Sequence, residues 1–263
     1  MNFHQNGQIK YLTFPLLDED KRISHGIFQR HGGCSPSPWN SLNLSTTVGD
    51  LKQNVIENRR RIMHALGLPE DDYFDVWQIH SAEVVVSENP RSREQNYIQA
   101  DAIITGTPGV ALLMRFADCV PVLLFDPINC VIGLAHAGWM GTVKKIAKIT
   151  VEKMKAEFGS KPNDIQAFIG PSISAINYPV GLDVLNNVKA AFPEHWNFLI
   201  LDKDGQPHLD LWKANEYGLK EAGVENVSFS NICTAANKQD WFSHRAENGK
   251  TGRFAILFSI KNE

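Results

Sequence analysis

Three residues that commonly bind transition metals lie far apart in the sequence: His80 in WQIHS, Cys119 in ADCVP and His136 in AHAGW. Each falls at or just beyond the end of a predicted strand, so a sheet could bring the three together. Two imidazoles and a thiolate suit zinc, and three protein ligands leave a fourth position open, which is the pattern of a catalytic zinc site. Their spacing matches no compact metal motif, so two other interpretations stay open. Cys119 could be a nucleophile with His136 as its base, or all three could be satisfied polar side chains in the core.

The elements that must position these residues follow from the periodicity of the apolar residues. Runs rich in β-branched and aromatic residues predict strands, whereas apolar residues three and four positions apart predict helices. One helix is expected to be capped by Asp50, to carry Val55 and Ile62 on its buried side and to stop at Gly67. The expected strands are residues 9–14, 23–28, 73–79, 100–105, 110–114, 120–125, 131–136, 165–169, 227–229 and 253–260, and the other expected helices are 143–158, 182–191 and 210–222.

These elements indicate the fold class. Helices and strands alternate too irregularly for a barrel or a Rossmann sheet, and neither GxGxxG nor GKS/T occurs. We therefore expect an α+β sandwich with a mixed or antiparallel central sheet and helices outside. The polar stretch 87–99 is expected to be one long loop, and residues 1–263 are expected to form a single domain.

The composition narrows the class of protein further. Of the 263 residues, 43% are hydrophobic and 21% are charged, which excludes a wholly disordered chain. The net charge of −3 lacks the basic excess of a nucleic-acid or anionic-membrane binder, so a small polar partner is expected. There is no signal pattern and no apolar run near the ~20 residues of a membrane span, which predicts a cytoplasmic protein. Four cysteines without a CxxC pair indicate free thiols.

Several long motifs give the chain a family resemblance. They run through nearly the whole sequence in one order: HGGCSPSPWNSLNLSTTVGD, VIENRRRI, WQIHSAEV, ADAIITGTPGVALLMRFADCVPVLLFDP, IGLAHAGWMGTV, IGPSISAINYPVG and WFSHRAENGKTGRFAILF. In these motifs the chain resembles the YfiH/LACC1 family, also called the laccase-domain or polyphenol oxidase-like family, whose members are regarded as purine nucleoside phosphorylases. The resemblance implies a YfiH-like fold, a single-domain α/β/β/α sandwich with mixed sheets.

The same resemblance implies a metal site and an activity. It implies zinc bound by His80, Cys119 and His136, with phosphorolysis of adenosine, inosine and 5′-methylthioadenosine and with adenosine deamination as a second reaction. Two positions depart from the family pattern: Ser172 stands where members usually have cysteine, and Ala246 where a second basic residue is common. The zinc triad is intact, so these departures bear on contacts and preferred substrate.

Other motif residues suit a phosphorolysis site, which must hold phosphate against C1′ of the sugar and neutralise the leaving purine. Arg59 lies close to the buried face of its helix and needs a partner; with Arg245 it could supply charge to phosphate. His244 could donate to phosphate or to the leaving base. Asn43 could bond ribose or base, although a turn-forming asparagine is common. Asp118 could orient a ligand histidine or accept a proton, and joins the triad as a candidate catalytic residue.

Three other functions remain as alternatives. A copper polyphenol oxidase would need clustered imidazoles, but none of the nine histidines forms an HxH pair, so copper is less favoured than zinc. The resemblance also allows an editing factor that acts on a peptidoglycan precursor. A binding or scaffolding protein with a vestigial site is the third.

Overall fold

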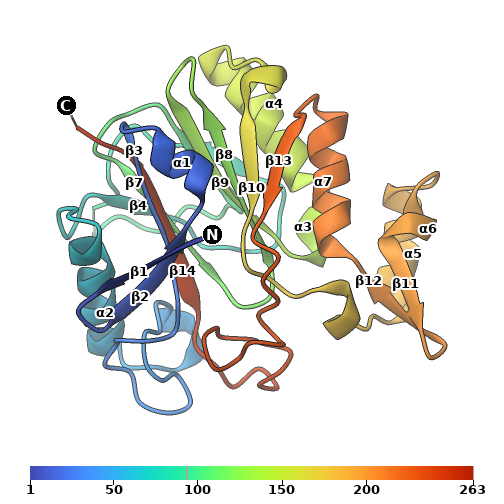
Figure 1. The fold of residues 1–263 in the computed structure, drawn as a ribbon, viewed down its shortest axis with the longest axis horizontal. Coiled ribbons are helices and arrows are strands. Elements are labelled where there is room, and N and C mark those ends of the chain that lie inside the picture. Colours follow the sequence, from blue (N-terminus) through green and yellow to red (C-terminus); the bar gives the residue numbers. More distant parts are fainter. Residues whose placement is uncertain (93, 263) are drawn as a thin grey trace.

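Two six-stranded sheets pack face to face in the computed structural model, which describes residues 1–92 and 94–262 (Figure 1). The first sheet has the strand order β1 (Asn2–Asn6), β2 (Ile9–Thr13), β3 (Ile23–Phe28), β14 (Phe254–Ile260), β7 (Ala111–Phe116) and β4 (Tyr73–Asp75). The second has the order β13 (Asn226–Phe229), β10 (Gln166–Ile169), β8 (Val120–Asp126), β9 (Val131–Ala137), β6 (Ala102–Thr105) and β5 (Val84–Val86). Both sheets are mixed: β4–β7, β10–β13 and β5–β6 are parallel pairs among antiparallel ones.

Helices cover the outer faces of the sheets. The helix α2 (Lys52–Ala65) lies on the first sheet, whereas α4 (Ile146–Phe158) packs on β9 and against α7 (Leu211–Glu221) on the second. The short helices are α1 (Pro15–Glu19), α3 (Trp139–Val143), α5 (Leu182–Ala191) and α6 (Trp196–Leu199), with single 3-10 turns η1 (Thr46–Val48), η2 (Pro162–Asp164) and η3 (Ala175–Asn177). The expected α/β/β/α sandwich is confirmed.

Strand β14 shows why the sequences of the central strands are continuously apolar. Its side chains alternate between two cores: Phe254 and Ile256 pack between the two sheets, whereas Ala255 and Leu257 face the core beneath α2. All seven residues are buried. Burying a large apolar side chain is worth about 1.5–3 kcal/mol, so strands of this kind hold the layers together.

The structure differs from the expected elements in several places. The expected strand 73–79 ends at Asp75, because Gln78 turns to hydrogen-bond Arg115 on β7. Lys145, in the left-handed region at φ 61°, separates α3 from α4, so the segment after Gly138 forms two helices. Asp50 lies one residue before the N-cap Leu51 and bonds its N–H and the Asn54 amide.

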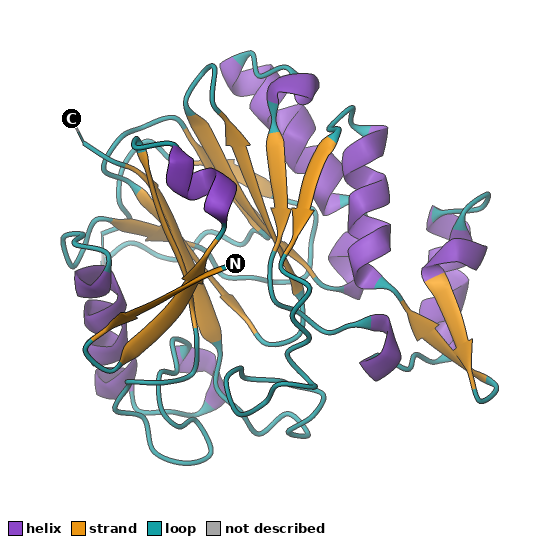
Figure 2. Cartoon of the chain, viewed as in Figure 1, coloured by secondary structure: helices purple, strands orange, loops and turns teal. Residues whose placement is uncertain are grey.

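Some elements were not expected at all. They are β1, α1, β5, α6 and a hairpin of β11 (Ile200–Lys203) and β12 (Gln206–Leu209), which with α5 and α6 projects beside the second sheet (Figure 2). Strand β1 is polar throughout and is defined by its pairing with β2. No helix in the described part of the chain is long and apolar enough to cross a membrane.

Candidate metal centre and its pocket

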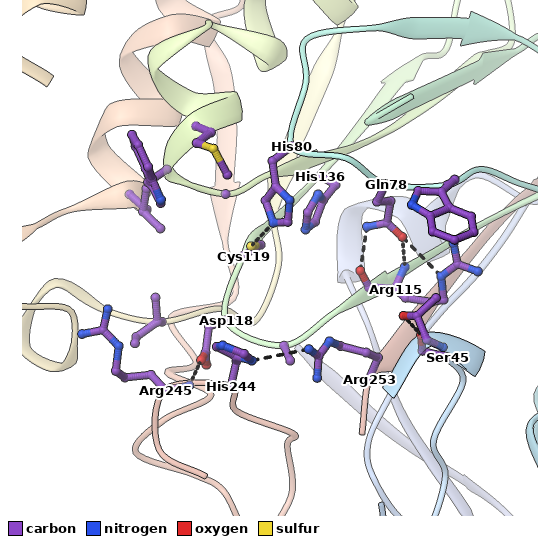
Figure 3. A pocket seen from close by; sticks show the side chains of 18 of the residues that line it. Ser45, Gln78, His80, Arg115, Asp118, Cys119, His136, His244, Arg245 and Arg253 are labelled. Atoms are coloured by element: carbon purple, nitrogen blue, oxygen red, sulfur yellow. Dashed lines mark hydrogen bonds between the residues drawn. The ribbon is translucent and has the colours of Figure 1, made fainter. Parts of the chain in front are cut away.

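The structure brings His80, Cys119 and His136 together at one end of the sandwich (Figure 3). His80 lies on the loop between β4 and β5, Cys119 on the turn between β7 and β8, and His136 on β9. The Sγ of Cys119 is 3.9 Å from Nε2 of His80, and one ligand atom from each residue lies within 4.8 Å of the other two. Among the described residues, this is the single group of metal-binding side chains found at such distances.

One carboxylate, Asp101, holds both histidine-bearing segments. Its Oδ1 lies 2.9 Å from Nδ1 of His136, and its Oδ2 accepts hydrogen bonds from Ser81 Oγ at 2.7 Å and from the backbone N–H groups of Ser81 and Ile79 at 2.5 and 3.2 Å. Because a carboxylate at Nδ1 fixes the proton there, Nε2 of His136 is left free to bind a metal. Asp101 therefore fixes the tautomer of His136 and the two residues on either side of His80.

The backbone around the metal centre lets the three ligand side chains come close together. A Cβ added to Gly138 would lie 2.8 Å from the Cys119 sulfur and 3.1 Å from a carbon of the His80 ring. Glycine is thus required where β9 leads into α3. His80 and Asp118 both have positive φ, 58° and 86°, a left-handed conformation that costs a non-glycine residue ~1 kcal/mol or more.

The electrostatics of the centre favour a thiolate beside a positive charge. Burial opposes ionisation of Cys119, but the charge and hydrogen bonds of His136 and His80 outweigh it and lower the Cys119 pKa to about 6. Burial likewise opposes the charged form of His136, but the Cys119 thiolate and Asp101 raise its pKa to about 9. Asp101 is also buried, yet hydrogen bonds from His136 and Ser81 lower its pKa to about 2. The centre therefore stabilises a positive charge next to the Cys119 sulfur, and a bound metal ion would supply such a charge.

A pocket of about 460 Å³ opens over the centre, a volume within the range of small-molecule sites. Its lining combines the triad with cationic, polar and aromatic side chains. They are Ser45, Thr46, Thr47, Trp77, Gln78, Tyr97, Arg115, Ala117, Asp118, Gly138, Trp139, Met140, Ile173, Tyr178, Leu211, His244, Arg245 and Arg253.

Three of the other residues expected at the site do line the pocket: Asp118, His244 and Arg245. Asp118 accepts hydrogen bonds from Thr234 Oγ1 and from the backbone N–H of Arg245, both at 2.6 Å. It therefore holds the His244–Arg245 loop against the Cys119 turn. The carboxylate bonded to a ligand histidine is Asp101 and not Asp118, so the expected orienting role belongs to a different residue.

Arg59 and Asn43 do not line the pocket. Arg59 is buried and pairs with Asp75 at 3.3 Å, because the apolar face of α2 carries it under the first sheet. Asn43 is fully buried and bonds Ser45 O, Asp50 and the backbone N–H of Arg253, as a loop-forming asparagine does. In this structure neither side chain reaches the pocket where they were expected to contact substrate.

The two departures from the family pattern also lie outside the lining. Ser172 is fully buried and accepts a hydrogen bond from Trp212 Nε1 at 2.7 Å, while its own hydroxyl donates to Gly170 O. Ala246 bonds Ser243 Oγ through its backbone N–H. Neither side chain reaches the pocket.

Sequence reasoning missed Asp101, Arg115, Gln78, Ser45 and Arg253. Each is a common residue type in an ordinary context, so composition and spacing carry no signal for it. Arg253 offered one clue, since it stands at the start of a predicted strand two residues after Thr251 in the motif that contains His244. The pairing register of β7, which the sequence does not reveal, decides that Arg115 lies at the same end of the sheet as the metal centre.

Together, the fold and the site define an α/β sandwich protein with a candidate metal centre at the base of a small-molecule pocket. Residues 24–261 match the family model described as multi-copper polyphenol oxidoreductase laccase. The chain belongs to this laccase-like family, which includes the proteins called YfiH and YlmD.

Named relatives and solved structures agree with this assignment. A purine nucleoside phosphorylase of Deinococcus radiodurans is 40% identical over 238 residues, covering 90% of this chain and 89% of the relative. The purine nucleoside phosphorylase YlmD of Bacillus subtilis is 34% identical over 92% of this chain and 90% of its own. The crystal structure of YlmD from Geobacillus stearothermophilus superposes with a TM-score of 0.91 at 30% identity, covering 99% of both chains.

Proposed function

We propose that this protein is a zinc-dependent purine nucleoside phosphorylase. Its substrates would be adenosine, inosine and 5′-methylthioadenosine, with adenosine deamination as a side activity. The observation that carries the proposal is the His–Cys–His group at the base of a cationic and aromatic pocket, in a chain 40% identical to a protein named purine nucleoside phosphorylase.

The donor set supports zinc at this centre. His80, Cys119 and His136 would hold the ion, since a thiolate with two imidazoles is a borderline-soft set that suits zinc. Bound there, zinc would supply Lewis-acid polarisation or a water of lowered pKa. A multi-copper oxidase needs several imidazole-rich sites, and the described residues contain one such group.

His244 is suited to donate a proton in the pocket. Arg253 Nη2 approaches Nδ1 of His244 at 3.4 Å, and a guanidinium can only donate, so Nδ1 accepts and the proton lies on Nε2. Burial and the charge of Arg253 lower the His244 pKa, which favours this neutral form. In phosphorolysis the bond from C1′ to the purine nitrogen breaks, a bond from C1′ to phosphate oxygen forms, and the purine leaves with a proton. Nε2–H of His244 would bond the departing purine.

Other residues hold this arrangement in place. Asp118 binds the backbone N–H of Arg245 and so fixes the loop that presents His244. Arg245 extends over the Tyr178 ring at 4.8 Å and donates to Pro179 O, which places a cation at the exposed side of the pocket. These contacts orient groups around substrate before it binds, which is the main contribution expected of such a site.

The test is product analysis with the purified protein. Adenosine and inosine should release adenine and hypoxanthine only when inorganic phosphate is present, and ribose 1-phosphate should form in equal amount. Equal purine release without phosphate would contradict phosphorolysis and identify a hydrolase. Inosine appearing from adenosine reports the deaminase activity, and a diphenol with added copper tests oxidase activity. Cys119→Ala should abolish phosphorolysis, whereas Cys34→Ala, at an exposed thiol on another loop, should not.

A further inference from the structure

The wall of the pocket beside β7 carries more positive than negative charge. Asp75 is fully buried and receives three guanidinium groups: Arg91 at 2.8 Å, Arg115 at 3.1 Å and Arg59 at 3.3 Å. Arginine stays charged in proteins, so one carboxylate faces three cations. Among the described residues, no other acidic side chain is paired with any of the three. The cluster therefore lacks an anion.

Arg115 is the member of this cluster that reaches the pocket. Its Nη1 bonds Asp75, its Nη2 donates to Val76 O, and its Nε lies 3.4 Å from Gln78 Oε1. Gln78 also bonds both backbone polar groups of Arg115, at 2.8 and 3.0 Å. The guanidinium is thus rigidly held, and each Nη retains one hydrogen for a further acceptor.

Arg253 is a second cation on the same wall. Its Nη1 donates to Thr251 O and Gly252 O at 3.2 and 2.9 Å, and its Nη2 approaches His244. Within the described chain the hydrogen bonds of its guanidinium go to these two carbonyl groups and to His244, and none goes to a carboxylate. Burial lowers its pKa more than the charges of Cys119, Asp118 and Glu247 raise it, so the cation is held partly out of water without a direct ion pair.

The sheet register places the two arginines side by side. Arg115 pairs with Ala255, and Arg253 lies two residues before Ala255. Side chains two positions apart in a strand share a face, so Arg253, directly before β14, is placed on the same face as Arg115, and both line the pocket. Figure 3 shows Arg115, Ser45 and Arg253 on one side of the pocket and Arg245 on the opposite side. Ser45 Oγ accepts from Thr47 N and lies 2.9 Å from Thr47 Oγ1, so its hydroxyl hydrogen is available to another partner when the Thr47 hydroxyl is the donor of that pair.

We propose that Arg115, Arg253 and Ser45 form a binding subsite for a phosphate group. Two guanidiniums and a hydroxyl that converge from different segments suit a divalent tetrahedral oxyanion, which accepts several charge-assisted hydrogen bonds. If the protein is a phosphorylase, the group is the inorganic phosphate that attacks C1′, and this identification rests on the proposed function. The excess charge of the Asp75 cluster attracts the anion whichever molecule carries it. The phosphate side of the pocket is then at β7 and β14, not at Arg59 or Arg245.

The experiment measures inorganic phosphate binding directly by isothermal titration calorimetry, so that it does not depend on turnover. Arg253→Gln and Arg115→Gln should each weaken phosphate binding about 10-fold or more, the effect of losing a charge-assisted hydrogen bond. Arg253→Lys keeps the positive charge but loses the planar guanidinium with its paired N–H donors, so it should weaken phosphate binding less than Arg253→Gln does. The matched control is Arg245→Gln, which removes the same charge from the opposite side and should leave phosphate binding within about 2-fold. Thermal unfolding confirms that each variant is folded.

The outcomes separate this proposal from the proposed function. Arg253-dependent phosphate binding by a protein that shows no phosphorolysis would uphold the subsite and reject the phosphorylase. Phosphorolysis with unchanged phosphate affinity and phosphate KM in both glutamine variants would overturn the subsite and keep the phosphorylase. A second arm titrates adenosine 5′-monophosphate. Binding of this nucleotide at least about 10-fold tighter than that of phosphate, and lost in Arg253→Gln, would assign the subsite to the phosphate of a nucleotide. Simultaneous binding of adenosine and phosphate, with the nucleotide bound no more tightly than phosphate, identifies the co-substrate.

Discussion

Replacing Asp101 by asparagine removes the acceptor that holds both histidine-bearing segments. An amide keeps one acceptor oxygen and puts an NH₂ donor where the second was. That donor would face either Nδ1–H of His136 or the donors of Ser81 and Ile79. In the first case His136 can move its proton to Nε2 and is lost as a ligand, and in the second the loop that presents His80 is released. Either way the centre is disrupted without touching a ligand.

The expected size of the effect follows from these contacts. Loss of the partner of a metal-ligating histidine typically costs about 10–100-fold in metal affinity or activity. Leaving a buried donor without its charged acceptor costs about 1.5–3 kcal/mol of folding stability. We therefore expect Asp101→Asn to lower zinc affinity by at least about 10-fold and to lower the free energy of unfolding by about 2 kcal/mol.

A matched variant separates the two effects. Asp126 is also fully buried and accepts from Ile128 N, Asn129 N and Asn129 Nδ2, but it does so at the far end of β8. Asp126→Asn should cost similar stability and leave zinc affinity unchanged. Zinc affinity is measured by competition with a chromophoric chelator, and stability by urea unfolding. If Asp101→Asn binds zinc as tightly as the unmodified protein, the argument that this carboxylate orients His136 and His80 is refuted.

Three further predictions concern the centre and the fold. Purified protein should contain about one zinc per chain by elemental analysis, and Cys119→Ala should lose metal and turnover together; retention of zinc with loss of turnover would favour Cys119 as a nucleophile. His80→Ala, His136→Ala and the double variant should show nearly equal residual activity, because the first substitution already removes the ion; losses that multiply would refute a shared metal. His25 is buried, and burial lowers its pKa to about 4, while its Nε2 accepts the Phe14 N–H at 2.8 Å, so the folded state needs neutral histidine. The free energy of unfolding should therefore fall as the pH drops from 6.5 towards 4, by roughly 2 kcal/mol at pH 5 from this group. In urea unfolding, His25→Gln should show a smaller fall over the same pH range. Equal pH profiles for the two proteins would contradict the assignment of this pH dependence to His25.

The strands that carry the ligands were largely predictable from the sequence. Buried apolar runs identified strands 120–125 and 131–136, which the structure extends by one residue each, and helix 182–191 has the expected bounds. Local periodicity fixes such elements because each one buries a continuous face. Strand β1 escaped prediction because its polar residues are held by pairing with β2 and not by burial.

Arg59 shows where sequence reasoning about the site fails. Helical spacing correctly placed it at the buried face of α2, and a buried guanidinium needs an anionic partner. The partner is Asp75, from a strand across the core, and only the tertiary fold could distinguish that carboxylate from a bound phosphate. Arg115 and Arg253 were missed for the converse reason, since their convergence depends on sheet register.

The position of β14 has a consequence for how this protein is made. This strand follows every other strand in chain order, yet it occupies the middle of the first sheet between β3 and β7. During synthesis on the ribosome, β3 and β7 each keep one unpaired edge until residues 254–260 emerge. Unpaired strand edges can pair with the wrong partner during this interval. Arg253 reaches its place only in that same step. A nascent chain therefore acquires its pocket last, and fragments that stop before β14 should be inactive and prone to aggregate.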